Sequence, residues 1–386
     1  MFINISDLMQ TLLQIKLKDK MMILATPGPV EVPFFAQEAI LGETIHHRTP
    51  EFKEIMKDTL SLFKKLINLD EAVFLSSSGT GAMEAAVINV VKKKALTINA
   101  GKFGERWGKI AKAHGIEFSQ LCYEWNTPAN VEDVIATIKA DSDIDSFFIQ
   151  VSESAGGLRH PVEEIASEIK KINPDIIVVA DGITAVGVEK IDTTNIDILI
   201  TGSQKALMLP PGLAMMGFSA KAVERIGEGK GFYFNLANEI KKQKEFTTAF
   251  TPATTLIIAL KAVLEKIINE VGLEELYAKT ATRHNALLKS LEAIGLDIYP
   301  SNPAKSMATI YTEQAEEIRK IMKNKYEVNM AGGQDHLKGK IFRINNMGLI
   351  EDYKMLWIVN SIEKTLDELG IRKFDGTAAK VFSENS

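Results

Sequence analysis

A lysine and an aspartate follow two apolar segments in the middle of the chain. Asp181 comes directly after segment 176–180, and Lys205 comes four residues after segment 197–201. Burial lowers the pKa of a lysine, and its neutral amine can then attack a carbonyl carbon. A nearby carboxylate could pair with a cationic ring nitrogen and keep that ring electron-withdrawing. Two plainer interpretations stay open at this point, because Asp181 could cap a helix and Lys205 could be an exposed lysine at a helix start.

A glycine-rich turn with the sequence SSGTG (77–81) follows another apolar segment, 72–76, and precedes a helical pattern. Glycines let a ligand approach the backbone, and the free N–H groups of a helix N-terminus bind phosphate. The turn matches neither the P-loop pattern nor the dinucleotide-binding pattern, which disfavours a dinucleotide oxidoreductase. By itself, a purely structural turn is an equally good interpretation.

Two further turns carry groups that could hold a planar ligand. The sequence AGKFG (100–104) follows segment 95–99, and Phe103 could stack on a ring or simply pack in the core. The sequence SES (152–154) follows segment 146–151 and could donate a hydrogen bond to a phenolic oxygen. A phosphate site, a ring anchor, a stacking aromatic and a reactive lysine together predict a pyridoxal-phosphate site.

The elements that position these groups alternate between strands and helices from about residue 70 to 220. Such alternation predicts a mostly parallel, doubly wound sheet, in which ligands bind beyond the carboxyl ends of the strands. Lys205 lies 24 residues after Asp181, a distance that fits one strand–loop–strand step. The predicted strands are 72–76, 95–99, 146–151, 176–180, 197–201 and 215–219.

The chain is predicted to have a large and a small domain with short terminal segments. Residues 1–23 are predicted to form an arm, because Ile5, Leu8, Leu12 and Ile15 fall on one helical face that could pack on a second subunit. Residues 24–265 should form the large α/β domain. Residues 266–370 should form a smaller α+β domain, and 371–386 a polar tail.

Composition excludes several classes of protein. The 386 residues carry a formal net charge of −5, with lysines and arginines spread along the chain, which argues against nucleic-acid binding. The single cysteine, Cys122, excludes an internal disulfide and a cysteine-built zinc site, so no metal site is expected. No apolar run reaches the ~18 residues of a membrane span, and the N-terminus does not resemble a signal peptide. We therefore expect a cytoplasmic protein.

These motifs resemble those of fold-type I, class V aminotransferases, close to the alanine–glyoxylate and serine–pyruvate group. The resemblance covers roughly residues 24–365. The matching segments are TPGP (26–29), HRTPEF (47–52), SSGTGAMEAAV (77–87), NAGKFGERWG (99–108), SESAGGLRHPV (152–162), ADGITAVG (180–187), GSQKAL (202–207), PPGLA (210–214), TAFTPATTLI (248–257) and FRINNMG (342–348).

The resemblance implies a role for each matched residue. Lys205 should bind pyridoxal phosphate as an internal aldimine and shuttle the substrate proton, and Asp181 should pair with the ring nitrogen. The other expected cofactor-binding residues are Phe103 and Ile183 on the ring faces, Ser154 near the ring oxygen, and Ser78, Gly79, Thr80, Gly81 and Gln204 around the phosphate. Thr251, assisted by Thr248, should reach the phosphate from the neighbouring subunit, which implies an obligate homodimer. Gly28 at the entrance and Arg343 at the α-carboxylate should bind the substrate.

The implied reaction moves an amino group from alanine, serine or aspartate to glyoxylate or pyruvate. This sequence departs from the usual family pattern in SESAGG (152–157) and in His46-His47-Arg48. Arg48 could reach the second carboxylate of aspartate, or it could be a structural arginine in the dimer interface.

Three other functions use the same fold. A cysteine desulfurase is disfavoured, because Cys122 lies early in the chain and is expected to be a buried core residue. A pyridoxal-phosphate lyase remains open, because Lys205 and Asp181 would serve it equally well. A catalytically silent subunit of a larger assembly is disfavoured because every expected cofactor residue is present.

Overall fold

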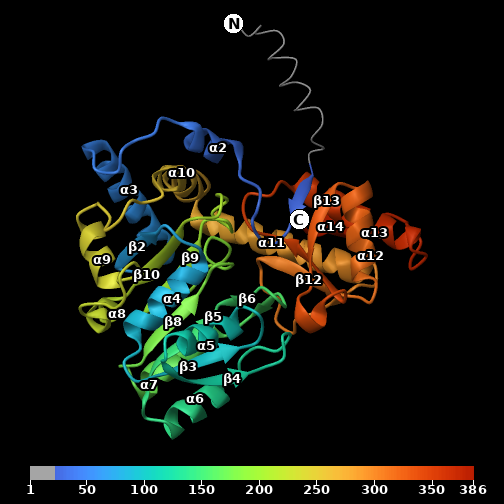
Figure 1. The fold of residues 1–386 in the computed structure, drawn as a ribbon. Coiled ribbons are helices and arrows are strands. Elements are labelled where there is room, and N and C mark those ends of the chain that lie inside the picture. The colour runs from blue at the N-terminus through green and yellow to red at the C-terminus, as the bar shows by residue number, and fades with distance from the viewer. Residues whose placement is uncertain (1–21) are drawn as a thin grey trace, which may run out of the picture.

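The larger of two main sheets forms the centre of the fold in the computed structural model, which describes residues 22–386 (Figure 1). Within these residues it has seven strands in the order β2-β10-β9-β8-β5-β3-β4. All run parallel except β10, which is antiparallel to β2 and β9, so the predicted mostly parallel sheet is confirmed. The strands are β2 (Glu71–Leu75), β3 (Lys94–Asn99), β4 (Glu117–Cys122), β5 (Ile144–Gln150), β8 (Ile177–Asp181), β9 (Ile198–Gly202) and β10 (Ala214–Phe218).

Helices cover both faces of this sheet because its strands are apolar on both sides. Successive side chains of a strand point to opposite faces. Phe147 therefore packs in the core beneath one set of helices and Phe148 in the core beneath the other. The first set is α3 (Pro50–Ile67), α6 (Val131–Ala140), α7 (Val162–Ile172) and α10 (Thr254–Glu265), and the second is α4 (Gly79–Val90), α5 (Gly104–Ala113), α8 (Ala220–Ile226) and α9 (Leu236–Lys244).

A second sheet of five strands lies in the C-terminal part of the described chain, in the order β1-β13-β14-β12-β11. Its strands are β1 (Ile23–Ala25), β11 (Asp297–Ile298), β12 (Met307–Tyr311), β13 (Val328–Gly332) and β14 (Ile341–Asn345). Strand β1 comes from the opposite end of the sequence and pairs in parallel with β13, which the sequence did not predict. The helices here are α11 (Leu273–Ala293), α12 (Ala315–Lys325), α13 (Asp352–Glu368) and α14 (Thr377–Asn385).

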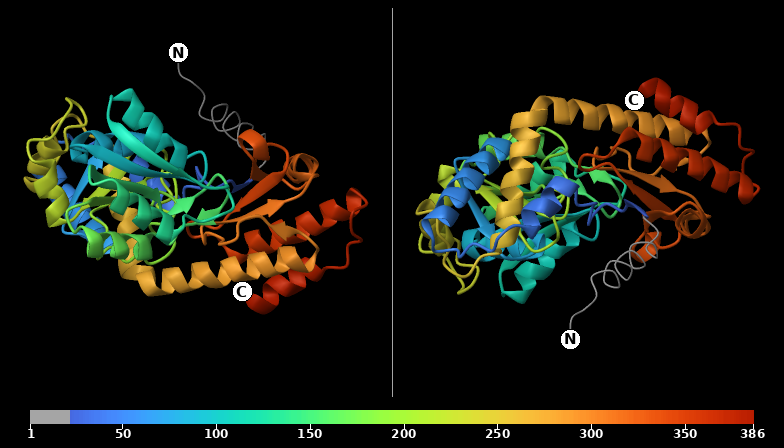
Figure 2. Two further views of the ribbon diagram at one scale, coloured as in Figure 1. Left: turned by 90° about the horizontal axis from the view of Figure 1, so that it is seen from below. Right: turned by 90° about the horizontal axis from the view of Figure 1, so that it is seen from above.

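Helix α11 joins the two parts of the molecule, and Figure 2 shows it running from the large sheet towards the small one. Leu276 near its start belongs to the core of the large sheet, whereas Leu287 and Leu291 belong to that of the small sheet. A π-helix, Lys266–Val271, continues α10 up to Gly272, whose φ of 86° ends it. The predicted domain boundary at residue 265 stays a prediction.

The remaining elements are short. Helix α2 (Phe34–Leu41) precedes α3, the strands β6 (Ser152–Glu153) and β7 (Leu158–Arg159) form a hairpin after β5, and the 3-10 turn Asp335–Leu337 precedes β14. The predicted N-terminal arm lies outside the described residues except for its last two. Among residues 22–386, no helix combines the length and hydrophobicity needed to cross a membrane.

Two expectations from the sequence need correction or extension. Cys122 is exposed, not buried as expected, because it ends the edge strand β4, which has a neighbouring strand, β3, on one side only. Residues 371–386 were predicted to form a polar tail, but they include helix α14. Its residues Ala378 and Phe382 are buried in the core of the small sheet. Only two apolar residues of α14 are buried, a signal too short to predict a docked helix from the sequence.

Candidate active site

The carboxyl ends of β8 and β9 bring Asp181 and Lys205 to the same edge of the large sheet. Asp181 is the last residue of β8 and lies opposite Ile200 of β9, and Lys205 follows in the turn after β9. The two charged groups lie close enough for each to shift the pKa of the other. The juxtaposition that the spacing predicted is therefore present in the structure.

The Lys205 amine is partly buried and points towards the loop after β1. Its Nζ donates a hydrogen bond to the carbonyl oxygen of Pro27 at 2.5 Å. Burial, and secondarily the positive charge of Arg343, lower the pKa of Lys205 to about 8, while Asp181 opposes the shift. Lys205 is therefore not the exposed surface lysine of the alternative interpretation.

Gly28 provides the space that this lysine occupies. A Cβ atom built on Gly28 would lie 2.5 Å from Cδ and 2.7 Å from Nζ of Lys205. Gly28 also has a φ of 92°, a conformation that favours glycine. Both observations explain why glycine stands at the predicted entrance of the site.

The rate at which pyridoxal phosphate reacts with the cofactor-free protein should rise with pH, with a midpoint near pH 8. Below its pKa of about 8 the Lys205 amine is protonated and cannot attack a carbonyl, and above it the amine is neutral. Stopped-flow absorbance between pH 6 and pH 10 measures this rate. A rate that does not change across this range, or one that falls as the pH rises, would contradict the assignment.

Asp181 is buried at the strand end and makes a local hydrogen bond. Its Oδ1 accepts from the Ile183 N–H at 2.9 Å, and burial raises the pKa of Asp181 to about 6, against the lowering effects of that N–H, of Arg106 and of Lys205. A turn and not a helix follows β8. The helix-cap interpretation is therefore wrong, and the carboxylate faces a cationic environment in which it could receive a protonated ring nitrogen.

The glycine-rich turn opens helix α4 as predicted. Ser78 precedes the helix, and its side chain makes no capping hydrogen bond to the first turn. A Cβ on Gly79 would lie 2.4 Å from Cδ1 of Ile183, and one on Gly81 would lie 1.9 Å from Oγ of Ser77. A side chain at either glycine would therefore displace Ile183 or Ser77, and the N–H groups of the first turn lack a side-chain acceptor from Ser78.

Ile183 and Gln204 lie next to each other beside Gly202, and Phe103 lies at the start of α5 beside Arg106. Ile183 contacts the glycine turn on α4, and its Cδ1 would also lie 3.1 Å from a Cβ on Gly202. Phe103 directly precedes α5. The side-chain oxygen Oε1 of Gln204 is buried and has no hydrogen-bond partner within the described residues. A buried amide oxygen without a partner is costly, so a ligand group that donates a hydrogen bond to it would be stabilised there.

Arg343 reaches the site from β14 of the small sheet. It is 8% exposed, and its two terminal nitrogens donate to the carbonyl oxygens of Ser154 at 2.5 Å and Gly332 at 2.7 Å. Its buried Nε has no partner among residues 22–386, and burial lowers the pKa of Arg343 to about 10. The two hydrogen bonds fix the orientation of the guanidinium, and its Nε–H can still donate a hydrogen bond to an anion.

Thr248 and Thr251 lie apart from the lysine within one chain. The Thr248 hydroxyl donates to the Phe250 carbonyl at 2.6 Å, and Thr251 is exposed. The segment contacts the loop after β2, where the Ala253 N–H donates to Oγ of Ser76 at 2.8 Å. The contribution of these threonines to a neighbouring subunit stays a prediction.

Two charged residues of the site, Arg106 and Glu153, were assigned no separate role from the sequence. Arg106 donates to the Thr80 hydroxyl at 2.8 Å, and its guanidinium carbon lies 4.9 Å from the centre of the Phe103 ring. Glu153 is completely buried among backbone N–H groups. The one available signal for Arg106 was its position three residues after Phe103, on the same face of α5.

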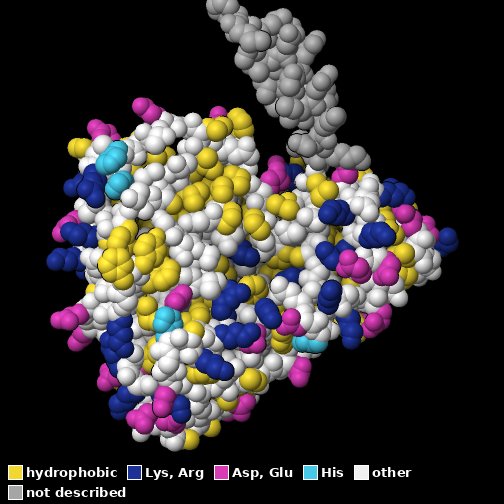
Figure 3. All heavy atoms as spheres, viewed as in Figure 1, with side chains coloured by type: hydrophobic (Ala, Val, Ile, Leu, Met, Phe, Trp, Pro, Cys, Tyr) yellow, Lys and Arg dark blue, Asp and Glu magenta, His cyan; other side chains and the backbone are white. Residues whose placement is uncertain are grey.

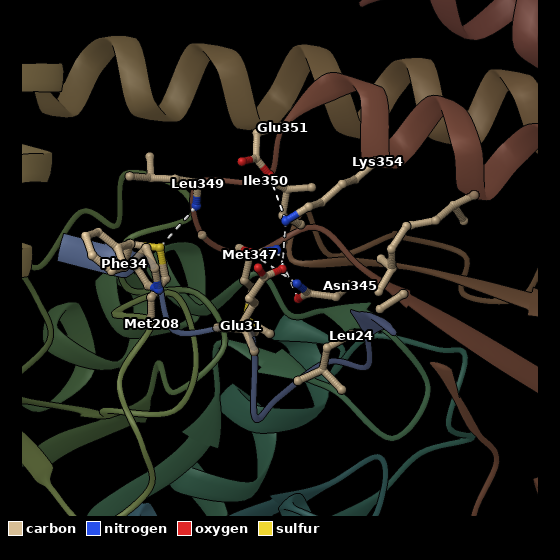
Figure 4. Close-up of a pocket in the computed structure, with 16 residues that line it drawn as sticks. Leu24, Glu31, Phe34, Met208, Asn345, Met347, Leu349, Ile350, Glu351 and Lys354 are labelled. Carbon is tan, nitrogen blue, oxygen red and sulfur yellow. Dashed lines mark hydrogen bonds and ion pairs between the residues drawn. The ribbon is translucent and has the colours of Figure 1, made fainter. Parts of the chain in front are cut away.

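A cavity of about 250 Å³ lies beside the site and not in it (Figure 4). Its lining includes Met208 and Asn345 but neither Lys205 nor Asp181. Figure 4 shows Lys354 between Glu31 and Glu351, at 2.8 and 2.9 Å, and the Leu349 N–H directed at Sδ of Met208. The Met208 contact connects the turn after Lys205 with the loop after β14, and the Lys354–Glu31 ion pair connects α13 with the loop after β1.

Comparison with known proteins identifies the family. The sequence model of the family "Aminotransferase class-V" matches residues 33–338. The chain therefore belongs to the class V aminotransferases, and the family inferred from the motifs is confirmed.

Several relatives match the chain over nearly its whole length. An uncharacterized aminotransferase of Helicobacter pylori is 47% identical over 94% of this chain and 98% of its own. A soluble hydrogenase 42 kDa subunit of Anabaena cylindrica is 33% identical over 95% and 99%. The L-aspartate–glyoxylate aminotransferase of Paracoccus denitrificans is 28% identical over 89% and 91%. Among solved structures, the subgroup IV aspartate aminotransferase of Thermus thermophilus is 32% identical, covers 89% of this chain and 99% of its own, and has a TM-score of 0.84.

Proposed function

We propose that this chain is a pyridoxal-phosphate-dependent aminotransferase that moves an amino group from aspartate, alanine or serine to glyoxylate or pyruvate. The observation that carries the proposal is that a partly buried Lys205 amine and the buried Asp181 carboxylate lie at adjacent strand ends, close enough to influence each other's pKa. Aspartate stands first among the donors because the Thermus thermophilus and Paracoccus denitrificans relatives bear its name.

The residues present fit this cofactor. The N–H groups at the N-terminus of α4 supply donors for the phosphate, and the side-chain NH₂ of Gln204 can donate to it as well. Phe103 and Ile183 supply apolar surfaces for the two faces of the ring, and the Ser154 hydroxyl would lie near its oxygen substituent. Asp181 supplies a buried carboxylate for the ring nitrogen.

Each side chain then has a defined task in the reaction. Pyridoxal phosphate, when bound, supplies a carbonyl carbon that reacts with amines and a ring that withdraws electrons. Lys205 would hold the cofactor, and its amine would move the proton at the substrate Cα. Asp181 would keep the ring nitrogen protonated. Arg343 binds the substrate α-carboxylate, because a planar guanidinium matches that group.

A homodimer completes the proposed site. Thr251 and Thr248 of one subunit would reach the phosphate held by the other. Figure 3 shows hydrophobic side chains gathered on one face of the large domain, and the strongly exposed Phe34, Leu41 and Phe232 are 73%, 84% and 84% exposed. Exposed apolar surface of this kind is typical of subunit interfaces, which supports the proposal.

A screen of amino donors against oxo-acid acceptors tests the proposed function. Purified protein loaded with pyridoxal phosphate is assayed with alanine, serine, aspartate and glutamate, each against glyoxylate and pyruvate. We expect turnover that requires both partners. If the exposed Arg48 of a neighbouring subunit binds the second carboxylate of aspartate, Arg48→Ala should raise KM for aspartate about tenfold and leave alanine unchanged.

The same screen separates the alternatives. Turnover without any oxo acid would indicate a lyase. Protein that takes up no cofactor and turns over no donor would indicate a silent subunit, a possibility that the name of the Anabaena cylindrica relative keeps relevant. A desulfurase is disfavoured further, because Cys122 lies on β4, which three strands separate from β9.

A further inference from the structure

Glu153 is a completely buried carboxylate next to the proposed cofactor site. Its side chain is 0% exposed, on the short strand β6 just after the carboxyl end of β5. A buried carboxylate is costly unless hydrogen bonds compensate for the lost hydration. The contacts of Glu153 show what compensates for it.

Backbone N–H groups from two loops converge on this carboxylate. Oε2 accepts from Gly104 at 2.7 Å and from Phe103 at 3.1 Å, and Oε1 accepts from Ala155 at 3.0 Å. Glu153 thus connects the loop after β3, which carries Phe103, to the loop after β5, which carries Ser154.

The loop after β3 is shaped around the carboxylate. A Cβ on Gly101 would lie 2.5 Å from both Cγ and Cδ of Glu153, so only glycine leaves room for the side chain. The AGKFG sequence therefore accommodates a specific buried group and is not only a flexible turn.

Glu153 also lies close enough to two charged residues of the site to interact with them. Burial lowers the pKa of Arg343, and the negative charge of Glu153 opposes that shift. Burial likewise raises the pKa of Glu153 to about 7, with a smaller contribution from Asp181. Arg343 also donates to the carbonyl oxygen of Ser154, the residue after Glu153. The same loop thus connects Glu153 to the arginine proposed to bind substrate.

We propose that Glu153 is a positioning residue that fixes the Phe103 ring and the Arg343 guanidinium relative to each other through the backbone of both loops. This inference rests on the proposed function, since it assigns Phe103 to the cofactor and Arg343 to the substrate. Glu153 itself contacts neither ligand and carries out no chemical step.

Glu153→Gln tests the proposal because glutamine has nearly the same shape but replaces one oxygen with an NH₂ group. Each carboxylate oxygen of Glu153 accepts a hydrogen bond from a backbone N–H. In either orientation of the glutamine amide, its NH₂ group would therefore face a backbone N–H, and one hydrogen bond would be lost. We expect the dissociation constant for pyridoxal phosphate to rise about 10- to 100-fold, and KM for the amino donor to rise as well. Absorbance titration of the cofactor-free protein measures the first quantity.

Glu363 provides a matched control in the small sheet region. It is also 0% exposed, and its carboxylate accepts from the N–H groups of Asp375, Thr377 and Ala378 at 3.1–3.3 Å. Glu363→Gln should lower Tm as Glu153→Gln does, but should leave cofactor affinity and KM unchanged.

A double-mutant cycle with Phe103→Leu shows whether Glu153 acts through the ring. If it does, the two losses of cofactor affinity will be less than additive.

An unchanged cofactor affinity in Glu153→Gln, with a loss of Tm equal to that of Glu363→Gln, would overturn the proposal. If Glu153→Gln does not fold, Glu153→Asp, which keeps the charge on a side chain one carbon shorter, is judged by the same criteria. Wild-type protein that binds no pyridoxal phosphate would instead overturn the proposed function, and this inference with it.

Discussion

Lys205→Ala is expected to remove covalent cofactor binding and to reduce transamination by about 10⁴-fold or more. The variant loses both the amine that holds the cofactor and the group that moves the Cα proton. The amine is well suited to both tasks, because burial lowers the pKa of Lys205 to about 8. Visible absorbance of the purified protein and single-turnover kinetics with an amino donor measure the two losses.

Lys102→Ala is the appropriate control for this variant. Lys102 lies on the loop that carries Phe103, but its ammonium pairs with Asp335 at 2.8 Å on the surface. Its removal should leave absorbance and turnover close to those of the wild type. Wild-type absorbance in Lys205→Ala would show that another group binds the cofactor.

Asp181→Asn is expected to have the second largest effect. Asparagine keeps the shape of the side chain but cannot supply the negative charge that would hold a proton on the ring nitrogen. Removing one member of a buried charge pair costs about 3–5 kcal/mol. Since about 1.4 kcal/mol corresponds to a factor of ten, kcat/KM should fall by about 10²- to 4 × 10³-fold.

Asp197→Asn serves as the matched control for Asp181→Asn. Asp197 is also buried, but it lies at the opposite end of the sheet, before β9, and pairs with Lys170 at 2.5 Å. Its loss should lower stability without changing kcat/KM of the folded enzyme. A value of kcat/KM for Asp181→Asn within twofold of the wild type would remove Asp181 from the mechanism.

The strands and helices of the large sheet could be predicted from the sequence because they follow from local patterns. Short apolar segments alternate with amphipathic helices, and each turn carries its own signal, as in SSGTG at the start of α4. Strand β1 could not be predicted in the same way. Its three residues pair with β13, about 300 residues away, and nothing in the local pattern of Ile23–Ala25 specifies that partner.

In the site, too, contacts set by neighbouring strands could be predicted, whereas contacts between segments distant in the sequence could not. Asp181 and Lys205 could be predicted to meet because Asp181 ends β8 and Lys205 follows the end of the adjacent parallel strand β9. The contact of Arg106 with Thr80 and the convergence of two loops on Glu153 depend on distances between separate segments. The exposure of Cys122 depends on strand order, because only that order makes β4 an edge strand.

Borohydride reduction followed by peptide mass spectrometry tests the central claim most directly. The cofactor-free protein is mixed with one equivalent of pyridoxal phosphate at pH 8, reduced and digested. The structure predicts a single stable adduct on the peptide that contains Lys205, at close to one per chain. An adduct spread over surface lysines, or confined to a different lysine, would contradict the assignment of Lys205 as the cofactor-binding residue.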